Sequence, residues 1–184
     1  SIEVMVQAHH FDGLVFLAGC DKIVPAMARA AGRLNIPCVF VTGGPARPGF
    51  YKGKDYAGYQ VREASAKLLN HEISEMEYDE LEKSACSGAG SCPMMGTANT
   101  MSCLMEPLGL ALPGCGTAHA TEAKKLRYAR RSGELVMKLV QENRRPRDYI
   151  SRETFLNTIR VDMAIGGSTN STIHLPAIAG EFGV

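Results

Sequence analysis

The stretch "DGLVFLAGCDKIVPAMARAAGRLNIPCVFVTGGP", residues 12–45, decides the fold of this 184-residue chain. Its apolar run over residues 13–19 is typical of a strand buried on both faces, and Ala, Met and Leu at helical spacing follow Pro25, a residue suited to a first helical turn. A second apolar run, residues 36–44, repeats the strand pattern. Parallel strands joined by so short a crossover are nearly always connected right-handedly. The stretch therefore predicts a strand, helix, strand unit.

The whole chain is predicted to be one α/β domain over residues 1–184. We expect a mostly parallel sheet flanked by helices, a three-layer α/β/α arrangement, with a helix-rich C-terminal half. The segment 43–58 holds glycines and prolines without an apolar period, which predicts a surface loop, and an active-site lid is one role open to it. Residues 60–84 are helical and charged, with Ser74 as a cap.

Four further helices are predicted in the C-terminal half. A Gly and Ser loop over residues 87–91 precedes a Met-rich helix from Pro93 to Gly109, which places Cys92 at a helix N-terminus. Residues 120–143 form an amphipathic helix, and residues from 152 on form a helix capped by Ser151. After a break at residues 166–167 the last helix begins near residue 168. The apolar side of the amphipathic helix is predicted to carry Leu126, Ala129, Leu135, Val136, Leu139 and Val140.

Composition excludes several classes of protein. Twenty Lys and Arg balance 19 Asp and Glu, and no basic block suggests binding to DNA or RNA. The apolar runs are shorter than the roughly 20 residues of a membrane helix, and no charged segment leads into an apolar signal core. Six cysteines without a secretion signal favour a reducing compartment. We therefore expect a soluble protein of the cytoplasm, or of an organelle in a eukaryote, that binds neither nucleic acid nor membranes.

Cys20, Asp21 and Lys22 follow the first strand, at the edge where open α/β sheets bind ligands. A thiolate binds soft metals and a carboxylate binds hard cations such as Mg²⁺, so adjacent residues can serve two metals. Lys22 fits such a site only if its amine is neutral or carries a carbamate. The alternative is a buried cysteine, an aspartate that caps the next helix and a solvated lysine.

Two other segments are candidates for chemistry. Backbone amides near Cys92 would donate to the sulfurs of an iron–sulfur cluster, whereas the alternative is a small residue in a tight turn, with Cys86 nearby. The turn "GGSTN", residues 166–170, has amides for a carboxylate or phosphate, or else Ser168 or Thr169 only caps a helix. His174 lies among apolar neighbours and is predicted to be a core histidine.

Several motifs together resemble one family, the dihydroxy-acid and phosphogluconate dehydratases with their sugar-acid dehydratase relatives. The matching pieces cover nearly the whole chain in family order: "FDGLVFLAGCDKIVPAM", "IPCVFVTGGP", "GAGSCPMMGTANTM", "EPLGLALPG" and "AIGGSTNSTIHLPAIA". The resemblance implies that Cys20 and Cys92 ligate an iron–sulfur cluster, of 2Fe-2S or 4Fe-4S type. It also implies that Asp21 and a carbamylated Lys22 bind Mg²⁺ as catalytic residues, with Ser168 and Thr169 as weaker candidates for substrate binding.

The implied reaction is loss of water from a 2,3-dihydroxy acid to give a 2-keto acid. The resemblance implies a fragment of a larger enzyme, inactive alone and homodimeric when complete. It would lack an N-terminal segment with a further cluster cysteine and magnesium carboxylate, and a C-terminal barrel-like domain with a magnesium glutamate and the serine base. Residues 145–170 resemble more closely a dihydroxy-acid dehydratase of branched-chain amino-acid biosynthesis, while "GAGSCPMMGTANTM" and "LPGCGTAHA" resemble an aldonate or phosphogluconate dehydratase. A noncatalytic phosphate- or nucleotide-binding domain is the alternative of another class.

Overall fold

A computed structural model describes residues 1–184 and confirms the strand, helix, strand unit. Strands β1 (Leu14–Ala18) and β2 (Cys38–Thr42) are parallel, in a register that pairs Leu14 with Cys38 and Ala18 with Thr42. Helix α2 (Ile23–Leu34) connects them, with Pro25 in its first turn. An isolated bridge between Phe40 and Ala111 extends the sheet on the far side of β2. The chain is therefore α/β as predicted, although its parallel sheet is small.

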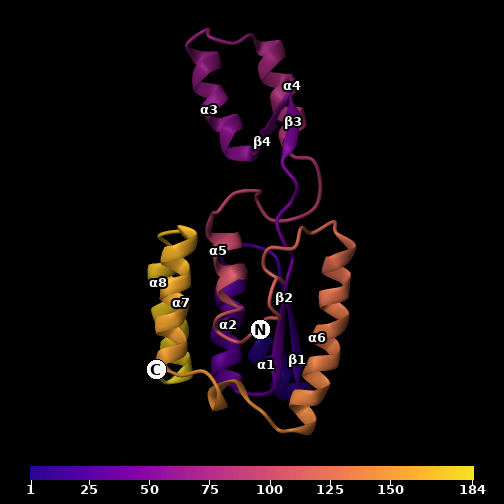
Figure 1. The fold of residues 1–184 in the computed structure, drawn as a ribbon, viewed down its shortest axis with the longest axis vertical. Helices are drawn as coiled ribbons and strands as arrows, with labels where there is room; N and C mark the ends of the chain where they lie inside the picture. The colour runs from indigo at the N-terminus through magenta and orange to yellow at the C-terminus, as the bar shows by residue number, and fades with distance from the viewer.

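Helices lie on both sides of this sheet, and a further helical pair lies outside them (Figure 1). Helix α6 (Ala123–Gln141) covers one side, where Leu135 and Leu139 share a cavity lining with Val39. The opposite side is covered by α2 and α5 (Thr97–Leu104), with α7 (Arg152–Ile165) and α8 (Ser171–Phe182) beyond them. The short elements α1 (Ile2–His9) and η1 (Pro146–Asp148) complete this body.

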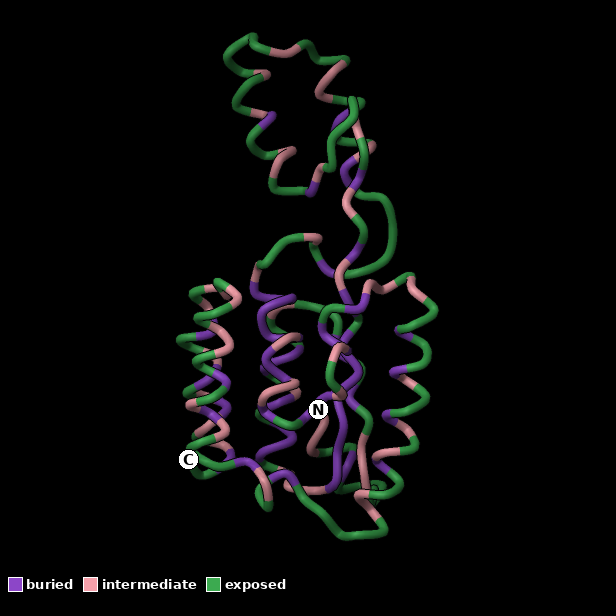
Figure 2. Tube along the Cα trace, in the orientation of Figure 1, coloured by how far each residue is buried: buried purple, intermediate pink, exposed green.

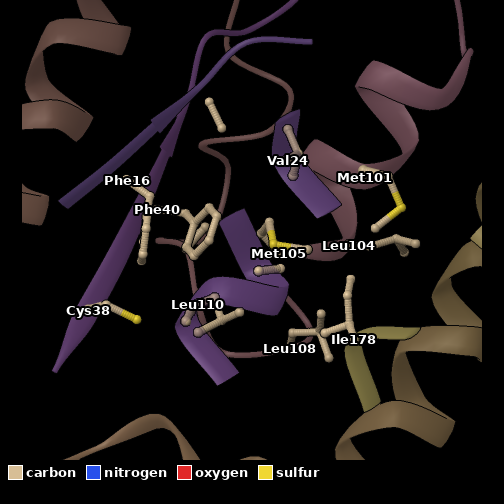
Figure 3. Close-up of a cluster of buried hydrophobic side chains, with 14 of the residues drawn as sticks. Phe16, Val24, Cys38, Phe40, Met101, Leu104, Met105, Leu108, Leu110 and Ile178 are labelled. Atoms are coloured by element: carbon tan, nitrogen blue, oxygen red, sulfur yellow. The ribbon is translucent and has the colours of Figure 1, made fainter. Parts of the chain in front are cut away.

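The core of the body lies between the sheet and α5 (Figure 3). The rings of Phe16 and Phe40 stack with their centroids 4.8 Å apart, and Met101, Leu104 and Met105 are fully buried beside them. Alternate residues of β1 face the other way, where Val15 is 39% and Leu17 is 68% exposed. The prediction that this strand is buried on both faces is therefore wrong. Strand β1 is at the edge of the sheet, whereas every residue of β2 is buried.

Residues 49–85 form a lobe that projects from the body (Figure 1). It consists of a hairpin of β3 (Gly49–Tyr51) and β4 (Lys54–Tyr56), followed by α3 (Gly58–Leu69) and α4 (Glu75–Ala85). Lys52 and Gly53 both have positive φ, the backbone of a type I′ hairpin turn. The segment predicted as a surface loop thus contains a hairpin, which the two-residue turn of Lys52 and Gly53 indicates.

Two chain segments, residues 45–48 and 86–91, form the neck between the lobe and the body. They pair with each other through bridges between Pro45 and Ser91 and between Pro48 and Cys86. Figure 2 shows that the lobe is mostly exposed, while buried residues concentrate in the body. The lobe is therefore attached by a two-stranded connection and not by packing against the main core.

The predicted helix positions are partly confirmed. Ser74 and Ser151 cap α4 and α7, each accepting a hydrogen bond from the amide three residues later. Leu126, assigned to the apolar side of α6, is 75% exposed. The Met-rich helix begins at Thr97 instead of Pro93, because residues 93–96 form bends, and α8 begins at Ser171. No helix has both the length and the apolar character needed to cross a membrane.

Candidate functional site

The carboxyl ends of β1 and β2 lie at the end of the body that faces the lobe (Figure 1). The pairing continues one residue past the strands, since the Gly43 amide donates to the Ala18 carbonyl at 2.7 Å. A Cβ on Gly43 would lie 3.1 Å from the Cα of Gly19, so the two chains pass very close here. The residues that leave β1 and β2 are thus held side by side.

Cys20, Asp21 and Lys22 leave β1 at this edge. The Cys20 thiol lies 3.9 Å from Asp21 Oδ1, and Lys22 Nζ lies 3.7 Å from Asp21 Oδ2. Cys20 is exposed, as is more than half of the Lys22 side chain. Asp21 does not cap α2, because Lys22 occupies the N-cap position and no side chain accepts a hydrogen bond there. The thiol and the carboxylate are therefore open to a ligand.

Cys92 is brought to the same edge by its neighbours. The Ser91 amide donates to the Gly44 carbonyl at 3.0 Å, and the Ala46 amide donates to the Ser91 carbonyl at 2.8 Å. Asn99 of α5 holds the other side of the loop, since its Nδ2 donates to the carbonyls of Cys92 and Met94 at 2.8 and 2.6 Å. The loop bearing Cys92 is thereby fixed to the end of β2.

The conformation of the Cys92 loop requires glycine at one position. Gly90 has a φ of 134°, and a Cβ there would lie 2.3 Å from the amide nitrogen of Ala46. Cys92 is exposed and precedes α5 by several residues, so the prediction that it sits at a helix N-terminus is wrong. Its position follows instead from the strand-like pairing of Ser91 with Gly44 and Ala46.

Cys92 also lines a cavity of about 430 Å³ between the neck and the lobe. The lining includes Arg47, Tyr59, Arg62 and Cys86, together with the glycine-rich loop. Arg47 is engaged with Glu122 at 3.1 Å. Arg47 and Arg62 are thus the charged residues of the lining, and one of the two charges is already paired.

His174 is a site residue that the sequence reasoning missed. Its Nε2 lies 3.4 Å from Lys22 Nζ, although 152 positions separate the two residues. The pKa of His174 is lowered by partial desolvation and by the Lys22 charge, with Asp21 acting in the opposite direction. The prediction of a core histidine is therefore wrong. The available signal was helical spacing, because His174 lies one turn after Asn170 of the "GGSTN" turn.

The "GGSTN" turn is held to the N-terminus of α5. The Ser168 amide donates to Thr100 Oγ1 at 2.9 Å, and the Ser168 hydroxyl lies 3.0 Å from Thr97 Oγ1. The amides of Asn170, Ser171 and Thr172 also have acceptors within the turn. Thr169 is exposed. These contacts connect α5 to the turn that precedes α8. A substrate-binding role for Ser168 and Thr169 stays a prediction.

Cys38 and Cys115 are buried, unlike Cys20 and Cys92. Cys38 is 1% exposed at the opposite end of β2, and its burial raises the pKa of the thiol to about 12. Cys115 is buried as well, and its sulfur and carbonyl oxygen face Lys125. Cys38 is thus buried and remote from the edge.

Comparison with known proteins identifies the context of this site. Residues 1–184 match the family described as "Dihydroxy-acid/6-phosphogluconate dehydratase N-terminal". The chain is 53% identical over 184 residues to dihydroxy-acid dehydratase 1 of Methanosarcina acetivorans, and 51% identical over 181 residues to the dihydroxy-acid dehydratase of Methanothermobacter thermautotrophicus. It is 50% identical over 184 residues to the enzyme of that name from Halothermothrix orenii. These alignments include 98–100% of this chain, which spans only 33% of each relative.

Proposed function

Because this chain belongs to the dihydroxy-acid/6-phosphogluconate dehydratase family, as its N-terminal part, we propose that the whole protein removes water from a 2,3-dihydroxy acid. The product would be a 2-keto acid, and the relatives named dihydroxy-acid dehydratase favour the substrates of branched-chain amino-acid biosynthesis. The main support from the geometry is that Cys20, Asp21 and Lys22 share one sheet edge with Cys92.

The donors at this edge fit an iron–sulfur cluster and Mg²⁺. Cys20 and Cys92 carry exposed thiols, which are suitable ligands for iron. The carboxylate of Asp21 does not cap α2 and is a suitable ligand for Mg²⁺. No three His, Cys, Asp or Glu side chains of this chain converge on one point. Cys20 and Cys92 would therefore be part of a ligand set, with further ligands from the rest of the protein.

When bound, the cluster and Mg²⁺ would supply Lewis acidity for the departing hydroxyl and neutralise charge on the substrate carboxylate. The chain's own residues hold and orient these groups. Lys22 would contribute oxygen ligands as a carbamate: its amine nitrogen bonds to the carbon of CO₂, and one proton leaves to solvent. Asp21 stands beside Lys22 and would bind the same ion. The cavity beside Cys92 would be the route by which substrate reaches these groups.

The free thiols support a reducing compartment. All six cysteines are unpaired, which agrees with the cytoplasm as the proposed location, because disulfides are rare there. Homodimer formation by the whole protein stays a prediction.

The decisive experiment measures iron, acid-labile sulfide and the visible absorption spectrum of the full-length protein purified without oxygen. We expect a brown protein that converts a 2,3-dihydroxy acid to a trappable 2-keto acid. Cys20→Ala and Cys92→Ala should lose the chromophore, whereas the matched variant Cys86→Ala, in the same cavity as Cys92, should keep it. A colourless, iron-free protein after anaerobic reconstitution would refute the proposal.

A second variant separates the two metals. Asp21→Asn should keep the chromophore and lose turnover, because the carboxylate is assigned to Mg²⁺ and not to iron. Loss of the brown colour in this variant would show that Asp21 is assigned to the wrong metal.

A further inference from the structure

We propose that His174 positions Lys22, keeping the lysine side chain beside Asp21 so that its amine can become a carbamate. The inference rests on the proposed function, since it concerns the residue assigned there to Mg²⁺. Lys22 Nζ lies between two partners, 3.4 Å from His174 Nε2 and 3.7 Å from Asp21 Oδ2. His174 would be a positioning residue that acts through Lys22.

A lysine at this place needs such a partner. The Lys22 side chain is 61% exposed and precedes α2 at a strand exit, so few packing contacts restrict its rotamers. Fixing a free lysine side chain costs rotamer entropy. Lys22 is the only side chain that hydrogen-bonds to the His174 ring. An imidazole held in place would reduce the disorder of the amine before any ligand binds.

The imidazole is held because α8 is fixed against α2 at its far end. A Cβ on Gly32 would lie 2.9 Å from the ring of Phe182, so the two helices are in close contact. Arg29 pairs with Glu181 at 2.5 Å. Arg147 donates to the carbonyls of Gly32 and Glu181 at 3.1 and 2.9 Å and thereby joins both helices.

The near end of α8 is fixed independently. Asn170, its N-cap residue, donates from Nδ2 to Thr97 Oγ1 at 2.7 Å, and the Ser171 hydroxyl donates to Asp162 Oδ2 at 2.5 Å. His174 lies in the first turn, between these anchors and the Phe182 contact. The backbone that carries His174 is therefore held at both ends of α8.

The test measures the carbamate itself in the full-length protein. The protein is equilibrated with ¹³C-bicarbonate, and the carbamate carbonyl is observed by ¹³C NMR, with Lys22→Arg to identify the signal. His174→Ala should reduce the signal and weaken Mg²⁺ binding, measured by calorimetry, by roughly 10- to 100-fold, the usual effect of removing a residue that orients a metal ligand. Ile173→Ala, which alters an exposed neighbour on the same helix, should leave both unchanged.

His174→Gln keeps an acceptor for the amine and should restore much of the signal, and circular dichroism will show whether each variant is folded. A folded His174→Ala protein with the wild-type carbamate signal would overturn the inference while the proposed function stands. A folded His174→Gln protein with no more signal than the Ala variant would overturn the role of the hydrogen bond. A wild-type protein with dehydratase turnover but no carbamate would also overturn the inference, whereas absence of turnover in wild type counts against the proposed function.

Discussion

The body and the lobe are built by different physical means. The body contains a continuous cluster of 22 buried residues between the sheet and its helices. The lobe buries only Gly49, Ala57, Ala64, Leu81 and Ala85 of residues 49–85. It is held by exposed pairs such as Lys52 with Glu77 and Lys83 with Asp79, and by a hydrogen bond from Tyr51 to Glu80. Exposed pairs contribute little each, so the lobe is the less stable part.

This contrast bears on function because the candidate ligands are attached to the body. Cys20, Asp21 and Lys22 follow β1 directly, and Cys92 is tied to the end of β2 and to α5. The lobe contributes only Gly58, Tyr59, Arg62 and Ala85 to the wall of the cavity beside Cys92. The candidate ligands are thus held by the rigid body, whereas one wall of the cavity belongs to the less stable lobe and can adjust to what binds there.

The largest expected effect is a loss of turnover on substitution of Lys22 in the body, compared with Lys52 in the lobe. Lys22→Arg should lower turnover of the full-length protein at least about 100-fold, because a guanidinium keeps the charge but cannot form a carbamate ligand. Lys52→Arg preserves an exposed ion pair with Glu77 and should leave turnover unchanged. Steady-state kinetics measures both. Near-normal turnover of Lys22→Arg would show that Lys22 is only a surface charge.

The next effect concerns the core of the body. Phe40 is fully buried and stacks on Phe16. Phe40→Ala should lower the free energy of unfolding of the body by about 3–5 kcal/mol, the usual cost of such a cavity. Chemical denaturation monitored by circular dichroism measures this loss. A cost below about 1 kcal/mol would mean that this core is not the main source of stability.

A smaller effect should be confined to the lobe. A Cβ on Gly49 would lie 1.7 Å from the Ser84 carbonyl oxygen, so Gly49→Ala should separate β3 from α4 at a cost of about 1–3 kcal/mol. Hydrogen exchange should show lost protection in residues 49–85 and unchanged protection in β2. Gly58→Ala is the matched control, because nothing lies within 4 Å of its added Cβ. Equal loss of protection in β2 would show that body and lobe unfold together.

The smallest effect is the loss of one helix cap. Ser74 Oγ accepts from the Glu77 amide at 3.2 Å. Ser74→Ala should lower the stability of α4 by about 1 kcal/mol, again visible only in the lobe by hydrogen exchange. Ser74→Asn, which retains a capping oxygen, should restore most of it. A body-wide change in exchange would contradict the independence of the two parts.

The sequence by itself determined the elements whose signals are local. Apolar runs of strand length predicted β1 and β2, the helical period after Pro25 predicted α2, and Ser74 and Ser151 predicted the starts of two helices. The exit of Cys20, Asp21 and Lys22 at the carboxyl edge follows from the same pattern, because the end of a strand is encoded beside it. The hairpin had a local signal too, in the Lys52-Gly53 turn.

Only the tertiary structure decided which surfaces meet. An apolar run in the sequence does not predict whether a helix covers both faces of the strand. The exposure of Val15 and Leu17 therefore depends on where α6 packs. The position of Cys92 depends on the pairing of Ser91 with Gly44 and on the hydrogen bond from Asn99 to the Cys92 carbonyl. No helical or strand pattern in the sequence predicts either contact. His174 meets Lys22 because α8 packs on α2, across 152 positions of sequence. Local sequence preferences determine the backbone conformation of a helix or strand. Which elements it packs against depends on how the whole chain buries its apolar surface.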